Sequence, residues 1–251
     1  MFQDTASVAH WLKKLQEEHR NQIRQGPFFR NMPAASSAAD FQWIRQLYHL
    51  SADFTAAVAL RYGGCQDARF RDAFGEHAAE EVTHPAELAH WMREFGFLAP
   101  DEEPTSVPPT WETLALGSYL IRAVMREPTA HQIISLNLMS EGIACDFFTC
   151  VNPKLAELGL SPKGYWAAHA KADMRHELLG LDLIPQCDLD SPLGRTYARV
   201  AFEVASLSGK AFDSWSVRTP ETRTTTSLPP HSEVLSKGPR ERIVERSSER
   251  A

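Results

Sequence analysis

The sequence predicts an all-α protein built as a seven-helix bundle. Apolar residues recur three and four positions apart through most of the chain, which is the period of an amphipathic helix. No stretch alternates apolar and polar residues in the way that a half-buried strand would. The 251 residues, 43% of them hydrophobic, suffice for one globular domain with a sizeable core.

The first three helices are expected at 5–24, 38–62 and 67–95, separated by Gly26-Pro27 and Gly63-Gly64. The apolar stripes of the first two consist of Val8, Trp11, Leu12 and Leu15 and of Phe41, Ile44, Leu47 and Tyr48.

Four more helices are expected at 111–126, 129–150, 162–184 and 191–215. The breaks before and between them are the proline-rich stretch 100–109, Pro153, Ser161-Pro162 and Asp190-Ser191-Pro192. Ser or Asp can cap a helix and Pro can occupy its first turn. Helices joined by such short loops must pack side by side.

The composition changes near Val217. Residues 217–251 are rich in Thr, Ser, Pro and charged residues and poor in aromatics, so they cannot bury enough apolar surface to offset the entropy of ordering. We expect a helical domain at 1–216 and a disordered C-terminal tail at 217–251.

Composition excludes several classes of function. The net charge of −6 argues against binding of nucleic acid, which would require a basic stripe on the surface. The 4 cysteines form no CxxC pair, which argues against a disulfide framework or a thiolate zinc site and favours the reducing cytoplasm. No continuous apolar run of about 18 residues is evident, so we expect neither export nor a membrane span.

The segment 165–177 carries the most informative pattern. His169, Asp173 and His176 lie four and three residues apart, which places them on one stripe of a helix. Neighbouring residues are apolar or small, so the stripe faces inward or toward a cavity. Burial of a carboxylate and two imidazoles must be compensated, either by a metal or by hydrogen bonds along a surface stripe.

A second cluster contains an E-x-x-H pair, Glu81 and His84, one helical turn apart. In carboxylate-bridged diiron bundles such a pair supplies a bridging carboxylate and a terminal imidazole. Pro85 follows directly and removes an intrahelical hydrogen bond, so the helix is expected to kink beside the pair.

The third candidate is Glu141, the only acid for a dozen residues on its N-terminal side in an apolar helix. A lone carboxylate there must be protonated, paired or metal-bound. The combined set of three carboxylates and three imidazoles on three helices suits two Fe(II) or Mn(II) ions better than structural zinc.

In this order, Glu81-x-x-His84, Glu141 and His169-x-x-x-Asp173-x-x-His176 resemble the ligands of the haem-oxygenase-like diiron oxidases and oxygenases. The likeness extends over most of residues 35–185. It implies a seven-helix haem-oxygenase-like bundle in which Glu81, His84, Glu141 and His169 hold one iron. Asp173 and His176 would hold the other, with Glu141 or Glu81 shared.

The resemblance implies two Fe ions (Mn being possible), O2 as co-substrate, and oxidation of a small molecule in a biosynthetic pathway. Relatives of this fold commonly dimerise, so a homodimer is possible. Family members desaturate substrates, cleave C–C bonds or N-oxygenate amines, and the N-oxygenating ones tend to carry an extra carboxylate ligand. One turn before Glu81 stands His77 instead, which favours C–H or C–C chemistry.

A carboxylate on the substrate would need a cationic anchor. Arg61, Arg122 and Arg175 are the candidates, because a guanidinium matches a carboxylate. Candidates to line the pocket or contact substrate are Trp166, Tyr48 and His77, the last of which could instead donate a hydrogen bond to a ligand.

Two other readings stay open. One is a metal-free relative, such as a thiaminase-like hydrolase, for which Cys145 is the one tempting nucleophile. The other is a non-catalytic helical protein that binds a metal or a partner through its tail. A metal-free relative, whether a thiaminase-like hydrolase or a cofactorless oxidase, would not use all six candidate ligands.

Overall fold

The computed structural model describes residues 7–215, and within that range it describes residues 170–174 by their backbone alone. All regular secondary structure in the described range is helical, and this range contains no strand. The all-α fold class is therefore confirmed. The predicted tail at 217–251 lies outside the described residues.

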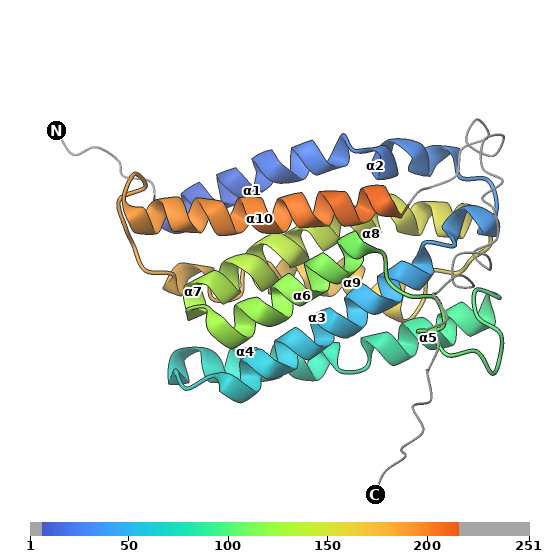
Figure 1. The fold of residues 1–251 in the computed structure, drawn as a ribbon, viewed down its shortest axis with the longest axis horizontal. Coiled ribbons are helices and arrows are strands. Elements are labelled where there is room, and N and C mark those ends of the chain that lie inside the picture. Colours follow the sequence, from blue (N-terminus) through green and yellow to red (C-terminus); the bar gives the residue numbers. More distant parts are fainter. Residues whose placement is uncertain (1–6, 216–251) are drawn as a thin grey trace, which may run out of the picture. The chain divides into compact units, whose positions relative to one another are not determined.

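Each of the seven expected regions contains helix (Figure 1). In chain order the elements are α1 (Val8–Arg24), α2 (Pro27–Asn31), η1 (Met32–Ala34), η2 (Ala38–Phe41), α3 (Ile44–Gly64), α4 (Ala68–Glu81), α5 (His84–Glu94), α6 (Trp111–Arg126), α7 (Thr129–Gln132), η3 (Ile133–Glu141), α8 (Gly142–Glu157), α9 (Tyr165–His176), η4 (Leu181–Leu183) and α10 (Pro192–Ser214).

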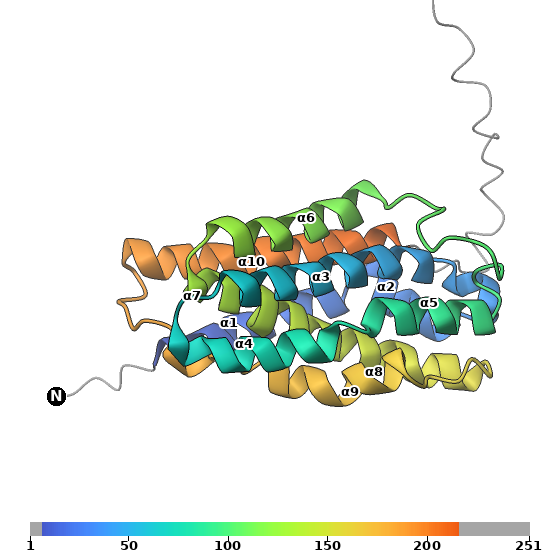
Figure 2. The ribbon, with the colours of Figure 1, turned by 90° about the horizontal axis from the view of Figure 1, so that it is seen from below.

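The long helices run side by side along the bundle (Figures 1 and 2). Helix α3 packs against α4, α5 and α6, while α10 packs against α1, α6 and η3. Helix α8 contacts α9, which also lies against α5 and η3. The segments with the candidate ligands are thus neighbours although they are far apart in the sequence.

The segment Thr129–Glu157, formed by α7, η3 and α8, is the central helix of the bundle. By length and composition it could cross a membrane, contrary to our expectation that no such stretch exists. However, 67% of its most apolar window is buried inside the protein, as in the core helix of a globular domain.

Several boundaries differ from the predicted ones; the helix expected at 162–184, for example, is Tyr165–His176. The expected helix at 67–95 is divided between α4 and α5, in agreement with the kink predicted beside Pro85. The predicted end of a helix at Pro153 was wrong, because α8 continues to Glu157. Val151 and Leu155 are buried on either side of Pro153, so packing offsets the one hydrogen bond that proline cannot make.

Candidate metal centre

Four segments bring six candidate ligands together inside the bundle. Two groups of side chains each have possible ligand atoms within 4.8 Å of one another. The first group is Glu81, His84 and His169, and the second is His77, Glu81, Glu141 and His176. All these side chains are buried, and Glu81 belongs to both groups.

The E-x-x-H pair spans a helix break. Glu81 is the last residue of α4 and His84 is the first residue of α5, with Nδ1 of His84 2.6 Å from Oε2 of Glu81. Pro85 has no N–H to donate to the carbonyl of Glu81 four residues earlier. The hydroxyl of Thr55 on α3 donates to that carbonyl instead, at 3.1 Å, and so holds the end of α4.

A π-helix presents Glu141. Glu141 ends η3, a nine-residue π-helix whose wider turns loosen the usual backbone ladder. The side-chain amide of Gln16 donates to the carbonyl of Leu138 from the neighbouring helix α1. Gly142 makes room for this amide, because a Cβ there would lie 1.9 Å from Nε2 of Gln16.

Helix α9 supplies two imidazoles whose outer nitrogens are fixed by acceptors. Nδ1 of His169 donates to the carbonyl of Tyr165 at 2.7 Å, which leaves Nε2 bare at 3.9 Å from Glu81. Nε2 of His176 donates to Glu80 at 2.6 Å, which leaves Nδ1 bare at 3.7 Å from Glu81. In both residues the bare nitrogen faces the centre, the arrangement of a metal-ligating histidine oriented by an outer acceptor.

Two polar atoms at the centre lack the partners that burial demands. Oε1 of Glu81 and Nδ1 of His176 are buried without a hydrogen-bond partner among the described residues. Unsatisfied buried polar atoms are costly, and a metal ion would satisfy both. The donors are carboxylate oxygens and imidazole nitrogens, a set that suits Fe(II) or Mn(II). The residues present therefore fit a metal centre.

Burial and neighbouring charges shift the pKa values of several residues in the cluster. Burial alone would raise the pKa of Glu141, but hydrogen bonds and charge from His176 and His77 lower that pKa well below its ordinary value. Burial lowers the pKa of His169. Burial opposes charge on His84 as well, but the adjacent Glu81 carboxylate raises the pKa of that imidazole.

The grouping differs in one respect from the assignment that the resemblance implied. Glu141 lies with His176 and His77, not with the pair His84 and His169, and Glu81 is the carboxylate common to both groups. The side chain of Asp173 lies outside the described residues, so the structure does not place it.

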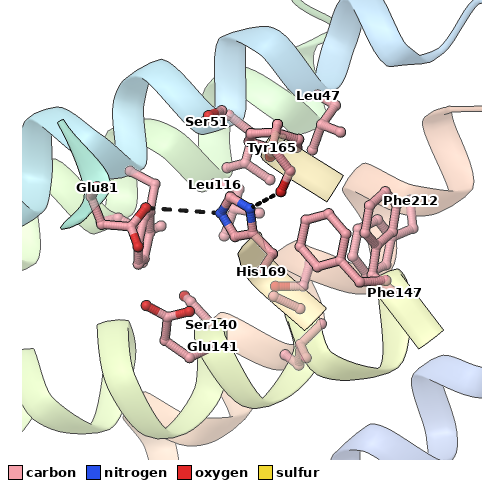
Figure 3. A pocket seen from close by; sticks show the side chains of 17 residues that line it. Leu47, Ser51, Glu81, Leu116, Ser140, Glu141, Phe147, Tyr165, His169 and Phe212 are labelled. Carbon is pink, nitrogen blue, oxygen red and sulfur yellow. Dashed lines mark hydrogen bonds and ion pairs between the residues drawn. The ribbon is translucent and has the colours of Figure 1, made fainter. Parts of the chain in front are cut away.

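A cavity of about 90 Å3 adjoins the first group (Figure 3). Glu81, Glu141 and His169 face it from one side, and Phe147 and Phe212 close it on another. The remaining lining residues are Leu47, Leu50, Ser51, Phe54, Leu116, Leu120, Ser140, Ile143, Ala144, Phe148, Tyr165 and Ser208. The lining is apolar apart from the centre and a few hydroxyl groups, and no Lys or Arg is among the described side chains that line it.

The three arginines suggested as anchors for a substrate carboxylate lie elsewhere. Arg61 is buried, but it contacts His77 and does not line the cavity. Arg122 is exposed and pairs with Glu127 at 2.6 Å, and Arg175 is exposed and pairs with Glu80. Helical periodicity would allow each of these arginine side chains to point into the bundle, but ion pairs and helix packing determine where each guanidinium lies.

Other suggested residues also stand outside the cavity lining. Trp166 is fully buried between aromatic side chains, and Tyr48 packs against the core. Cys145, the candidate nucleophile of the thiaminase-like alternative, is not among the lining residues either.

Sequence reasoning missed two polar partners of the cluster. Glu80 is not among the predicted site residues, but its carboxylate accepts from His176. Asn137 is a buried amide in the π-helix that donates to the backbone carbonyl of His176 at 3.0 Å. A lone amide in the apolar run 133–143 was the available signal for Asn137, whereas nothing in the spacing marks Glu80.

Comparison with known proteins agrees with this geometry. The model of a family described as iron-containing redox enzymes matches residues 41–208, which include every candidate ligand. No curated protein matches the chain.

Two solved structures share the fold. A domain of unknown function with a haem-oxygenase-like fold from Shewanella denitrificans OS217 has a TM-score of 0.66 and 18% identity, covering 82% of this chain and 90% of its own. A TenA homologue from Pseudomonas syringae pv. tomato DC3000 has a TM-score of 0.67 and 14% identity, covering 83% of this chain and 92% of its own. At such identities the likeness establishes the fold alone, a haem-oxygenase-like bundle.

Proposed function

Because the chain belongs to the family of iron-containing redox enzymes, we propose that it is a non-haem diiron oxidase or oxygenase. One observation carries the proposal: two groups of buried carboxylates and imidazoles share Glu81, and the cavity lies against them. A shared carboxylate between two donor sets is the arrangement that a two-metal centre needs.

Glu81, His84 and His169 would hold one iron. Glu81, Glu141 and His176 would hold the other, and the resemblance adds Asp173 to that set. Iron bound there would supply the redox chemistry, namely activation of O2 for oxidation of a C–H or C–C bond. The chain's own part is to keep the ligands oriented through Tyr165 and Glu80.

The cavity limits what the second reactant can be. Its walls are aromatic and aliphatic, so they exclude water and receive an apolar group next to Glu81 and His169. The hydroxyl groups of Ser51, Ser140, Tyr165 and Ser208 also belong to the lining, beside any polar substituent. We therefore propose a small substrate whose reacting part is apolar. If that substrate is an amino-acid-like or other carboxylate compound, as the family likeness suggests, its acid group is not held by an arginine of the cavity wall.

Position in the cavity would select the product, because a substrate held rigidly beside the centre exposes one bond to oxidation. We favour desaturation or C–C cleavage over N-oxygenation, since no described carboxylate beyond Glu81 and Glu141 joins the two groups. We place the protein in a reducing compartment such as the cytoplasm, because its 4 cysteines form no CxxC pair.

Anaerobic titration with Fe(II), followed by exposure to O2 with ascorbate as electron donor, tests this function. We expect two irons per chain by Mössbauer spectroscopy and O2 uptake that accelerates with one member of a panel of amino acids, fatty acids and matched neutral analogues. Product analysis separates desaturation, C–C cleavage and N-oxygenation.

Glu81→Ala should lose both irons, because this carboxylate belongs to both groups. Glu76→Ala is the matched control, since Glu76 is exposed on the same helix α4. Wild-type protein that binds no iron, or a Glu81→Ala variant that keeps both ions, would refute the proposal.

A further inference from the structure

His77 lies among the candidate ligands, with Nε2 2.8 Å from Oε1 of Glu141. We propose that His77 is not a metal ligand but a positioning residue, which donates a hydrogen bond to Glu141 because Arg61 fixes its tautomer. This inference rests on the proposed two-metal centre and concerns which of the surrounding imidazoles bind the metals.

Arg61 is the unusual partner in this contact. It belongs to α3, and its side chain is only 2% exposed. Its guanidinium lies 4.0 Å above the ring of Phe74, and no carboxylate forms an ion pair with it among the described residues. Burial lowers the pKa of Arg61 to about 9 although Glu141 opposes this, so the group still carries its proton at neutral pH.

The hydrogen bonds of His77 decide where its own proton is. Nη2 of Arg61 lies 2.8 Å from Nδ1 of His77. A guanidinium can only donate, so Nδ1 accepts. The remaining proton of a neutral imidazole must then be on Nε2, which donates to Glu141. A nitrogen that carries a proton has no lone pair for a metal.

Two other imidazoles of the cluster show the opposite polarity. The outer nitrogens of His169 and His176 donate to acceptors, a carbonyl and a carboxylate, so their inner nitrogens are bare. The outer nitrogen of His77 meets a donor, so its inner nitrogen is protonated. Histidine side chains at one centre thus have different roles, which depend on whether the outer ring nitrogen meets a hydrogen-bond acceptor or a donor.

A second arm of the same guanidinium supports the ligand helix. Nη1 of Arg61 donates to Oδ1 of Asn137, whose Nδ2 donates to the backbone carbonyl of His176. Arg61 therefore steadies the Glu141 carboxylate through His77 and the end of α9 through Asn137. The hydrogen bonds also connect the buried Arg61 guanidinium to the Glu141 carboxylate through the imidazole of His77, so the two charges interact through one intervening ring.

The tautomer can be measured without any metal. Long-range 1H–15N correlation spectra of metal-free protein labelled with 15N-histidine should show His77 protonated at Nε2 and His169 protonated at Nδ1. His77→Gln identifies the resonance by its loss. In Arg61→Met, Nδ1 keeps only the long contact with Nδ2 of Asn137 at 3.5 Å, so the His77 proton should redistribute between the two nitrogens.

Metal binding supplies the second readout, with Co(II) as the probe. His77→Gln keeps an amide N–H to donate to Glu141 and an oxygen to accept from Arg61, but it offers no imidazole nitrogen. We expect this variant to bind two Co(II) per chain within a few-fold of wild-type affinity. His77→Ala removes the donor and should weaken the second ion by about 10- to 100-fold, the usual effect of losing an outer partner.

The Co(II)-loaded wild type should show three exchangeable, paramagnetically shifted imidazole N–H protons, from His84, His169 and His176. Four such protons, or loss of the second ion in His77→Gln as complete as in His77→Ala, would overturn the role of His77 while leaving the two-metal centre in place. An Nδ1-protonated His77 in metal-free protein would overturn it as well. Failure of the wild type to bind any Co(II) would overturn the proposed function together with this inference.

Discussion

The roles of His77, His169 and His176 in the centre depend on the hydrogen-bond partner of the outer ring nitrogen. Glu80 is the clearest case, because it is half-exposed and is not itself in either donor group, but it fixes the tautomer of the buried His176. The arrangement is a carboxylate, a histidine and a metal-facing nitrogen in line. The charge on Glu80 should therefore affect metal binding without contacting a metal.

The pH dependence of metal affinity tests this role of Glu80. Burial opposes a charged His176, but Glu141 and Glu80 raise the pKa of His176 above its ordinary value of 6.5. Metal must displace that proton, so affinity should rise about tenfold per pH unit and become constant only above the raised pKa. Glu80→Gln keeps the acceptor and removes the charge, so the plateau should begin at lower pH.

Calorimetric titration with Co(II) between pH 6 and 9 measures the position of the plateau. Glu76→Gln removes an exposed carboxylate from the same helix and should leave the profile unchanged. A Glu80→Gln profile that coincides with the wild type would show that Glu80 does not control His176.

At the scale of elements, irregular backbone places the two acidic ligands. Glu81 ends α4 at the break that Pro85 imposes, and Thr55 replaces the missing backbone donor. Glu141 ends a π-helix whose Leu138 carbonyl is satisfied by Gln16. Both irregularities are stabilised by a side chain from another helix, so each ligand position depends on tertiary packing.

Gly142→Ala tests the support of the π-helix. A Cβ at this position would lie 1.9 Å from Nε2 of Gln16, so Gln16 must leave and the Leu138 carbonyl loses its donor. We expect a loss of about 1–3 kcal/mol in the free energy of unfolding, the usual penalty for an unsatisfied buried group. Binding of the metal held by Glu141 should weaken as well.

Gly63→Ala is the matched control, because nothing lies within 4 Å of a Cβ added to this helical glycine. It should be neutral or stabilise the protein by up to about 1 kcal/mol. Urea unfolding of the two variants gives the comparison. Equal stability of Gly142→Ala and wild type would mean that Gln16 does not support the π-helix.

These irregular elements mark what sequence could and could not predict. Helical periodicity is a local property, so the seven helical regions were predictable from the sequence. The break near Pro85 was predictable as well, because a proline cannot make the backbone hydrogen bond of a helix interior. The π-helix was not predictable, since it depends on a glutamine 122 residues from the carbonyl that it satisfies. The contact of Arg61 with His77 likewise exists only because α3 packs against α4.

For the molecule as a whole, the centre is a link between segments that are distant in the sequence. Its donors come from α4, α5, η3 and α9, and two of its buried polar atoms have no partner among the residues that the structure describes. Folding therefore brings buried carboxylates and imidazoles together at a cost that a bound cation offsets. Metal binding and stability of the whole domain should be coupled.

Metal should raise the unfolding temperature in proportion to the logarithm of its concentration. A ligand that binds only the folded state at 100 times its Kd stabilises that state by about 2.7 kcal/mol. Calorimetry with and without Co(II) measures this effect, and hydrogen exchange of α9, which carries His169 and His176, should slow when the ion is present. Glu81→Ala removes the shared carboxylate and should abolish both responses, whereas the exposed-site variant Glu76→Ala should retain them. Equal stabilisation of Glu81→Ala and wild type would place the bound cation outside the centre, because only binding through Glu81 can connect α4 to both donor groups.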